Sequence, residues 1–389
     1  MLVLNCGSSS VKFALIETSS ADSVASGLVE NLGADAHLKA NGPKGKVNEK
    51  ISGKDHGEAL ESVVSFLQNQ GVLEQGLVAV GHRVVHGGER FSGSVLITPQ
   101  VLDAVRACND LAPLHNPANL KGIEVASRVF PEVPQVAVFD TAFHQTIPAH
   151  AFLYPLPQSL YRERGIRRYG FHGTSHRFVS AKAAEMLGKP VADLCLITAH
   201  LGNGCSACAV LQGKSVDTTM GLTPMEGIPM GTRSGTIDPG IFRYLHDSLG
   251  WDFKRIDQLL NKESGLLGLS GLSNDMRTLA EARAQGHEGA TLAIDVFCYR
   301  LAKEIAALAI ALPRIDALVF TGGIGENSFL VRELTLAHLA VFGFQLDISR
   351  NGAHGRESKG IITRAETPTA MVVPTNEELL IALDSEQII

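Results

Sequence analysis

Four short segments rich in glycine, serine and asparagine have the composition of phosphate-binding turns. They span residues 5–10, 200–204, 227–235 and 322–327, and the sequence predicts that each follows a strand. Glycine lets backbone N–H groups approach an anion closely, and hydroxyl groups add neutral donors. One such turn means little, because most are only turns, but four in one chain favour phosphate binding.

Neither common nucleotide-binding fingerprint accompanies these turns. Residues 42–46 resemble the start of a P-loop, but Val47 stands where that motif needs serine or threonine, and the spacing is wrong. The turn at residues 322–325 lacks the third glycine of the dinucleotide-binding motif. The sequence therefore disfavours both P-loop and Rossmann enzymes.

Three charged residues suit phosphoryl transfer, whose transition state spreads negative charge over three oxygens. Arg83 follows an apolar strand, and Arg233 lies in the turn 230–235, where a cation binds an anion more often than on a helix surface. Asp140 ends the apolar strand 134–139, and ligand sites of α/β proteins gather at such carboxyl ends. A solvated arginine or a capping aspartate is the ordinary alternative for each.

The cysteines and histidines give little support for a metal site or for disulfide bonds. Six cysteines in 389 residues do not form a disulfide framework, and Cys205 with Cys208 is the only Cys-x-x-Cys. We expect both to be small buried residues of a strand. His82 and His86 have the spacing of a helical metal pair, but residues 83–85 read as strand, which would separate them by about 13 Å.

Strands and helices alternate around these segments. Apolar strands flank residues 5–10 and again 200–204, so two strand–turn–strand units suggest an internal duplication. Helical periodicity covers residues 58–70, a helix starts at 174–175 and ends at Gly188, and a long one runs from about 290 to 312. Thr98 and Asn116, each before proline, read as N-caps. This pattern predicts an α/β architecture with a domain junction near residue 145.

Composition excludes several classes of protein. The chain is 45% apolar and 19% charged, which argues against disorder. A formal charge of −6 and the absence of basic runs argue against nucleic-acid binding. No apolar stretch is long enough to cross a membrane, and the first residues lack the features of a signal peptide, so we expect a cytoplasmic protein.

Several longer motifs resemble those of the acetate kinase family. Residues 5–12 resemble its first signature and residues 167–176 its second, and the likeness runs from Leu2 to about Leu383. Further matching segments are 81–88, 112–117, 138–144, 200–204, 230–235, 321–327 and 374–378. The resemblance implies the fold of the actin, sugar-kinase and Hsp70 superfamily: α/β, with two duplicated RNase H-like domains and an active-site cleft between them. We expect residues 1–145 plus 377–389 to form the first domain, and 146–376 a second domain that carries the nucleotide site.

The resemblance also implies roles for individual residues. Asn5 and Glu377 would hold Mg²⁺, for which Mn²⁺ could substitute. Arg83 would bind the acceptor carboxylate, Arg233 and His172 would stabilise the phosphoryl group in transit, and Asp140 would be catalytic. Lys12 and His115 would lie near the phosphates. ATP or ADP would be bound by His200, Leu201, Gly202, Asn203, Gly204, Asp275, Met276, Arg277, Gly323, Ile324, Gly325, Glu326 and Asn327.

The implied activity is reversible transfer of the ATP γ-phosphoryl to acetate, which gives acetyl phosphate and ADP. A carboxylate is already ionised near neutral pH, because its pKa is about 4–5, so no strong base is needed. Asp140 is then better suited to orient Arg83 or the acceptor. The main barrier is the repulsion between two anions, which the arginines, His172 and magnesium would offset. We expect direct in-line displacement, in a cleft closed to water.

The choice of acceptor acid rests on four apolar positions that the resemblance assigns to the methyl pocket: Val85, Leu114, Phe171 and Pro224. Relatives acting on propionate tend to have a smaller residue at the position of Val85, so acetate is favoured, with propionate kinase as the alternative. A non-catalytic, nucleotide-gated binding protein of the same superfamily is the alternative from another class. A homodimer is the family expectation. Cys205, Ala207 and Thr236 depart from the usual pattern of the family. The family more often has aspartate where Thr236 stands, so the resemblance does not fix the charge next to Arg233.

Overall fold

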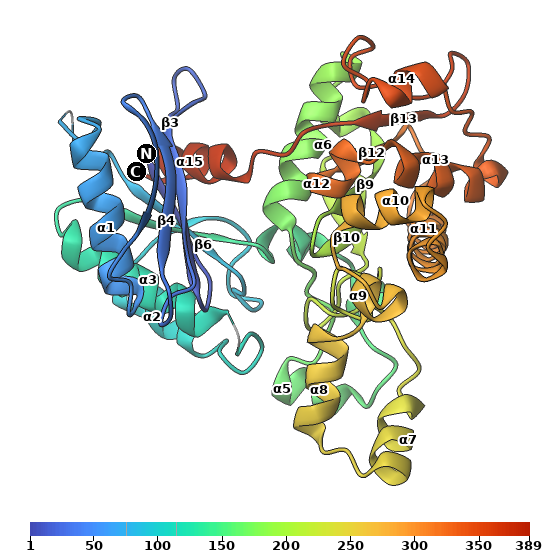
Figure 1. Cartoon of the computed structure of the whole chain (residues 1–389), viewed down its shortest axis with the longest axis horizontal. Helices are drawn as coiled ribbons and strands as arrows, with labels where there is room; N and C mark the ends of the chain where they lie inside the picture. Colours follow the sequence, from blue (N-terminus) through green and yellow to red (C-terminus); the bar gives the residue numbers. More distant parts are fainter. Residues whose placement is uncertain (75, 114) are drawn as a thin grey trace. The chain divides into compact units, whose positions relative to one another are not determined.

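The computed structural model describes residues 1–74, 76–113 and 115–389. It divides into two compact units, Met1–Gln145 with Asn376–Ile389, and Thr146–Thr375. Each unit is built around one mixed sheet, of eight strands in the first and five in the second, with helices packed on it (Figure 1). No described helix has both the length and the apolar character needed to cross a membrane.

The sheet of the first unit has the strand order β5-β4-β3-β2-β1-β6-β8-β7. Strands β1 and β2 form the expected hairpin, with Asn5 paired to Lys12, and β6 and β8 continue the sheet in parallel with β1. The elements are β1 (Leu2–Cys6), β2 (Ser10–Glu17), β3 (Asp22–Glu30), β4 (His37–Gly42), β5 (Gly45–Lys50), α1 (His56–Asn69), β6 (Val80–Val84), β7 (Val95–Leu96), α2 (Pro99–Arg106), α3 (Asn116–Val129), β8 (Gln135–Phe139), the 3₁₀ turn η1 (Ala142–Thr146) and α15 (Glu377–Ile388).

Strand β1 is apolar on both faces because helices cover both faces of the sheet. Leu2 and Leu4 pack in a core that includes residues of α1, whereas Val3 packs with Ile381 and Ala382 of α15. Since successive side chains of a strand point to opposite faces, α1 and α3 cover one face and α15 the other (Figure 1). The C-terminal helix therefore completes the core of the N-terminal sheet.

Side-chain caps fix where three of these helices begin. Asp55 accepts from the N–H groups of Gly57 and Glu58 at α1, and Thr98 accepts from Val101 at α2, as the Thr98-Pro99 pair predicts. Asn376 accepts from Leu379 at 3.0 Å and starts α15. Such caps satisfy N–H groups that have no partner within the helix. The cap at Asn376 makes Glu377 the first residue of α15.

The sheet of the second unit has the order β11-β10-β9-β12-β13. Strands β9 and β10 form the second expected hairpin, and β12 runs parallel to β9 and β13. The elements are α4 (Ala149–Phe152), α5 (Gln158–Arg164), α6 (Gly173–Leu187), η2 (Val191–Asp193), β9 (Cys195–Leu201), β10 (Cys205–Leu211), β11 (Lys214–Thr218), α7 (Gly240–Leu249), α8 (Phe253–Lys262), α9 (Gly265–Ser270), α10 (Met276–Ala284), α11 (Glu288–Leu308), η3 (Ala309–Ala311), β12 (Ala317–Thr321), α12 (Gly322–Asn327), α13 (Phe329–His338), η4 (Ala340–Phe342), α14 (Ile348–Gly352) and β13 (Thr369–Val372).

Three local predictions were wrong. Asn116 is not an N-cap: His115 takes that place, and the buried Asn116 amide bonds the backbone of His86 and Val105. Residues 322–327 form the short helix α12 rather than a turn, because side-chain contacts outweigh the low helix propensity of its three glycines: Glu326 accepts from the Gly322 N–H, and Arg332 donates to the carbonyls of Gly325 and Glu326. Residues 227–235 do not follow a strand directly, since β11 already ends at Thr218.

Candidate active site

In the first unit, an arginine and an aspartate meet at the carboxyl ends of neighbouring parallel strands. Arg83 lies near the end of β6 and Asp140 follows β8, so the register of the two strands brings them together. Arg83 donates to both carboxylate oxygens of Asp140, from Nε at 3.0 Å and from Nη2 at 2.5 Å. This two-point contact fixes the plane of the guanidinium, which a single contact would leave free to rotate.

The electrostatics of this pair favour a charged arginine. Asp140 is 1% exposed, and burial raises the pKa of its carboxyl, while the Arg83 guanidinium opposes that rise. Burial alone would lower the pKa of Arg83, but Asp140, Glu377 and Glu378 outweigh it and raise that pKa. Carboxylates thus outnumber cations around Arg83, which therefore stays protonated at any physiological pH.

Oxygen ligands suited to magnesium lie beside Arg83. Arg83 Nη1 is 3.5 Å from Asn5 Oδ1, and Nε is 3.9 Å from a carboxylate oxygen of Glu377. Glu378 pairs with Lys12, and all of these side chains line one small cavity. The described residues contain no cluster of three or more side chains able to cage a metal. Mg²⁺ needs no such cage, because it commonly binds one or two protein oxygens together with water and phosphate, so the donors present fit it.

The acceptor-pocket residues expected in the first unit are only partly described. Val85 directly follows β6 and is buried, and its N–H donates to the Asn119 side chain at 3.0 Å. Leu114 lies outside the described residues. His115 is half-buried at the start of α3. The structure therefore brings Asn5, Arg83, Asp140 and Glu377 together, with Lys12 at the edge of the group through Glu378.

In the second unit, His172 and Arg233 converge on the turn between β9 and β10. A methyl group placed on Gly204 would lie 3.4 Å from His172 Nε2 and 3.3 Å from Arg233 Nη2. The His172 ring also stacks on His200, with ring centres 4.3 Å apart. His172 adopts the left-handed conformation with φ 57°, which is uncommon for a residue other than glycine and is typical of functional positions.

A chain of hydroxyls and imidazoles supports His172 from behind. His172 Nδ1 is 2.9 Å from Ser206 Oγ, which is 2.8 Å from His176 Nε2, and His176 Nδ1 is 2.7 Å from Thr198 Oγ1. Ser206 has one hydroxyl proton for two ring nitrogens, so it can donate to only one of them. When it donates to His172, the neutral His172 ring carries its proton on Nε2, the edge that faces Gly204.

Arg233 differs from Arg83 in having no anionic partner within the described part of the chain. Its Nη1 donates to the backbone carbonyl of Pro224, and burial lowers the pKa of Arg233. Partial burial of a guanidinium removes water from a charged group. This costs free energy unless a carboxylate or another anion compensates the charge. This arrangement suits an arginine that binds an external anion.

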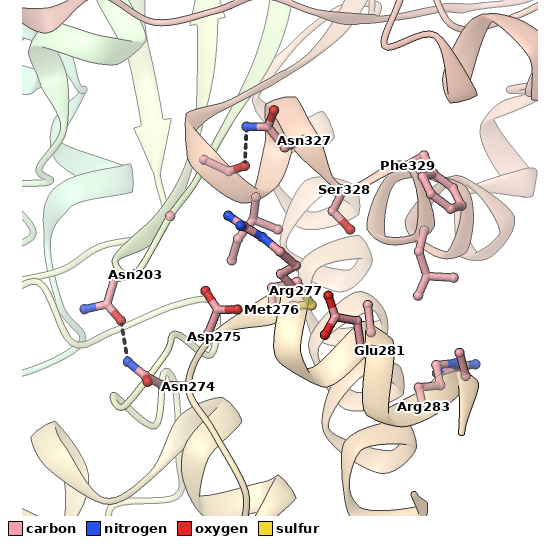
Figure 2. A pocket seen from close by; sticks show the side chains of 16 residues that line it. Asn203, Asn274, Asp275, Met276, Arg277, Glu281, Arg283, Asn327, Ser328 and Phe329 are labelled. Carbon is pink, nitrogen blue, oxygen red and sulfur yellow. Dashed lines mark hydrogen bonds between the residues drawn. The ribbon is translucent and has the colours of Figure 1, made fainter. Parts of the chain in front are cut away.

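A pocket of about 900 Å³ opens next to this turn in the second unit (Figure 2). Asp275 begins α10 by accepting from Thr278, and Asn274 donates to the Asn203 side chain at 3.3 Å, which joins two walls of the pocket. Asn327 bonds the Gly323 carbonyl at the opposite wall. Of the residues expected to bind nucleotide, those lining the pocket are Gly202, Asn203, Asp275, Met276, Arg277, Gly323, Ile324 and Asn327.

Six residues expected at the nucleotide site do not line this pocket. One is Lys12, which belongs to the first unit, and four more are Leu201, Gly204, Gly325 and Glu326. His200 is also absent from the lining and bonds Ser175 instead. Glu326 has a structural task, because it accepts from the N–H groups of Gly322 and Thr375 at 3.0 and 3.1 Å.

Sequence reasoning missed a buried cation beneath α12. Arg332 is fully buried, and burial lowers its pKa to about 10. It donates to the carbonyls of Gly325 and Glu326 and to Asn351, so it holds the end of α12 in place. No signal in the sequence separates this arginine from its solvated neighbours, although a cation near a helix C-terminus is a known stabilising arrangement.

A profile of the acetokinase family matches residues 1–383. The chain belongs to the acetokinase family. As the sequence predicts, its α/β fold with two sheets is that of a duplicated actin-like ATPase.

Individual relatives of this acetokinase-family chain are similar along its whole length. The acetate kinase of Stutzerimonas stutzeri is 56% identical over 386 residues, 99% of this chain and 97% of that protein. The acetate kinase of Deinococcus radiodurans is 54% identical over 389 residues, covering 98% of that protein.

Two solved structures match equally completely. A propionate kinase from Francisella tularensis superposes with a TM-score of 0.95 at 47% identity, covering all of this chain and 99% of that one. The acetate kinase of Porphyromonas gingivalis superposes with a TM-score of 0.93 at 46% identity, covering all of this chain and 98% of that one. ATP and ADP are substrates of a kinase of this family, so a nucleotide site belongs in the chain.

Proposed function

We propose that the protein catalyses reversible transfer of the ATP γ-phosphoryl to acetate. The observation that carries the proposal is the convergence of His172 and Arg233 on Gly204, beside a pocket of about 900 Å³. Two hydrogen-bond donors without a carboxylate between them suit a phosphoryl group whose charge grows during transfer. Full-length likeness to acetate kinases supports acetate as the acceptor.

In this proposal, Arg83 binds the carboxylate of the acceptor. Asp140 occupies one side of the guanidinium and fixes its plane, so the remaining N–H groups point in defined directions. Since the acceptor is ionised at neutral pH, Asp140 acts as an orienting group and not as a base. The attacking oxygen displaces ADP directly, with the P–O bond to the acceptor forming as the bond to the leaving oxygen breaks.

Asn5 and Glu377 would hold Mg²⁺, or Mn²⁺ in its place. The metal, when bound, would neutralise part of the charge on the nucleotide phosphates. Lys12 would add a further positive charge near the phosphates through its place beside Glu378. The nucleoside would be surrounded by the eight pocket-lining residues Gly202, Asn203, Asp275, Met276, Arg277, Gly323, Ile324 and Asn327. His200, Leu201, Gly204, Gly325 and Glu326 would support the β9–β10 turn and α12, which carry five of these eight.

Propionate remains the second candidate acceptor, because the propionate kinase of Francisella tularensis has nearly the same fold. The resemblance assigns Val85, Leu114, Phe171 and Pro224 to the pocket for the methyl group. All are of moderate size, which favours the smaller acid. A difference of one methylene between two acids typically changes the ratio of their kcat/KM values by about 10–200-fold.

The test is to mix the protein with Mg-ATP and acetate, propionate or butyrate and trap acyl phosphate with hydroxylamine. We expect kcat/KM for acetate to exceed that for propionate by about tenfold or more. Propionate as the better substrate would overturn the acceptor but retain the chemistry. Nucleotide binding without any acyl phosphate would instead favour a nucleotide-gated binding protein. Isolation of a kinetically competent phosphoenzyme would contradict direct transfer.

We also propose a homodimer, in keeping with the family. Large apolar side chains are exposed on α7 and at the start of α8, among them Tyr244, Leu249 and Phe253, the last 79% exposed. Sedimentation velocity over a range of concentrations distinguishes a dimer from a monomer. The cytoplasmic location expected from the sequence stays a prediction, which cell fractionation tests.

A further inference from the structure

A long segment without helix or strand carries two residues of the proposed site. Residues 219–239 lie between β11 and α7 and include both Pro224 and Arg233. Such a segment has no ladder of backbone hydrogen bonds to hold its shape, so other contacts must do so. Around Pro224, side-chain contacts come from Arg168, Glu226 and Tyr154, which we call the loop clamp.

Arg168 holds the first residues of the segment. Its Nη1 donates to the carbonyls of Thr218, Thr219 and Met220 at 2.7, 2.9 and 3.2 Å. Its Nη2 donates to Glu226 Oε1 at 2.7 Å, so one guanidinium joins the start of the segment to a residue two positions beyond Pro224. A planar group with several fixed donors can do this, whereas a lysine ammonium cannot.

Tyr154 closes the clamp from the other side. Its hydroxyl donates to Glu226 Oε2 at 2.5 Å and accepts from the Leu222 N–H at 2.9 Å. The clamp fits closely around Gly221, because a methyl group there would lie 1.8 Å from Glu226 Oε2 and 2.2 Å from the Tyr154 hydroxyl. A segment held at both ends around a glycine has little freedom to shift.

Backbone hydrogen bonds at Gly221 connect the clamped segment to a second wall of the proposed acceptor pocket. The N–H groups of Tyr169 and Gly170, which precede Phe171, donate to the Gly221 carbonyl at 3.1 and 3.3 Å. Pro224 follows in the clamped segment, and its carbonyl accepts from Arg233. Phe171, Pro224 and Arg233 are therefore held in one bonded framework within the second unit.

Charge explains why the clamp is built around an arginine. Burial raises the pKa of Asp217 and of Glu304, and Arg168 opposes the rise in both cases. Burial and the neighbouring Glu226 carboxylate also raise the pKa of Tyr154, which keeps its hydroxyl protonated and able to donate. Removal of Arg168 would take a positive charge away from several partly buried carboxylates at once, so milder changes are better probes.

We propose that the loop clamp determines which acid the enzyme accepts, by keeping Phe171 and Pro224 at a spacing that fits acetate and excludes one further methylene. This inference rests on the proposed function. A wall rejects a larger substrate only if it cannot yield, so the side chains that keep it rigid contribute to specificity as much as those that touch the acid. Tyr154, Arg168 and Glu226 are positioning residues in this account.

The experiment compares Tyr154→Phe and Glu226→Gln with the unchanged protein. Tyr154→Phe keeps the ring and removes only the hydroxyl, and Glu226→Gln keeps the shape and removes the charge. We expect the ratio of kcat/KM for acetate to that for propionate to fall by about fivefold to tenfold, within the range that one methylene controls. KM for acetate should rise, while KM for ATP should change by less than about twofold, because the nucleotide pocket has other walls.

Two further variants make the result decisive. Gly221→Ala pushes the clamp apart without removing any polar group and should lower the same ratio. Glu185→Gln, which alters only an exposed pair with Lys182 on α6, should leave the ratio unchanged. Equal losses for acetate and propionate in all three clamp variants would overturn the inference. Failure of the unchanged protein to form any acyl phosphate would instead overturn the proposed function.

Discussion

The two arginine sites solve opposite electrostatic problems. In the first unit, Arg83 contacts a carboxylate at two points and lies among further acidic groups, which raise its pKa. In the second, Arg233 contacts a carbonyl, and burial lowers its pKa. An arginine paired with a carboxylate has a fixed orientation, but the carboxylate neutralises part of its charge. An arginine without such a partner keeps its full attraction for an anion. The first suits a singly charged acceptor and the second a highly charged phosphoryl group.

Arg233→Met should have the largest effect on catalysis and the smallest on folding. We expect kcat to fall by about 10²–10³-fold, because the proposed donor to the phosphoryl group in transit is lost. The melting temperature should stay the same or rise, because no carboxylate of the described residues loses its partner. Single-turnover kinetics and thermal denaturation measure the two effects. A drop in melting temperature as large as that of an Arg83 variant would contradict the contrast between the sites.

Arg83→Met should damage stability as well as activity. Removal of one member of a buried ion pair costs about 3–5 kcal/mol, because Asp140 is left without its cation. Urea denaturation measures this cost, and Arg83→Met combined with Asp140→Asn should recover much of it. No recovery in the double variant would show that the guanidinium matters for packing and not for charge.

The stability of Arg83→Met should also depend on pH in a defined direction. Burial already raises the pKa of Asp140, and loss of Arg83 removes the effect that opposes the rise. A folded-state pKa above the unfolded value of about 3.9 means that the folded protein binds the proton more tightly. The variant should therefore be least stable at neutral pH and gain stability, relative to the unchanged protein, as the pH falls through the raised pKa. A stability difference that does not change with pH would contradict this account.

Ser206→Ala tests whether His172 in the second unit needs a neighbour that fixes its orientation, as Asp140 fixes that of Arg83 in the first unit. The substitution removes the hydroxyl that bonds both His172 and His176. We expect kcat to fall by about fivefold to tenfold with both KM values little changed, since one neutral hydrogen bond contributes about 1 kcal/mol. Ser206→Thr, which keeps the hydroxyl, is the matched control. Unchanged kcat in the alanine variant would mean that His172 needs no support from this chain.

Thr236→Asp should have the smallest effect, although it adds a carboxylate near the second site. Thr236 is exposed, and its hydroxyl accepts from the Gly227 N–H at 2.9 Å, a bond that an aspartate oxygen can also accept. We expect kcat to change by less than about twofold, because an exposed charge is well screened. A large fall in kcat would mean that Arg233 requires an environment free of carboxylates even at this distance.

Local sequence patterns predicted the elements whose causes are local. The hairpins around residues 5–10 and 200–204 follow from apolar strands on either side of a polar turn, and both are present. One predicted helix ends at Gly188 because glycine readily adopts the left-handed conformation there. Another begins at Thr98 because its hydroxyl caps the helix and proline follows. The predicted boundary was wrong at Asn116, whose side chain is buried, and the predicted turn was wrong at α12, where contacts of Glu326 and Arg332 stabilise a helix.

The sequence by itself determined the α/β fold and the family, because strand and helix periodicity and the two signature segments are written in neighbouring residues. It also identified Arg83, Arg233, His172 and Asp140 as candidate residues for phosphoryl transfer. Only the tertiary structure decided that Arg83 pairs with a carboxylate while Arg233 meets none among the described residues. It also decided that Ser206 supports His172, and that Arg168, Glu226 and Tyr154 hold the segment carrying Pro224. Partners of a buried charge lie far apart in the chain, and it is strand register and packing that bring them within hydrogen-bonding distance.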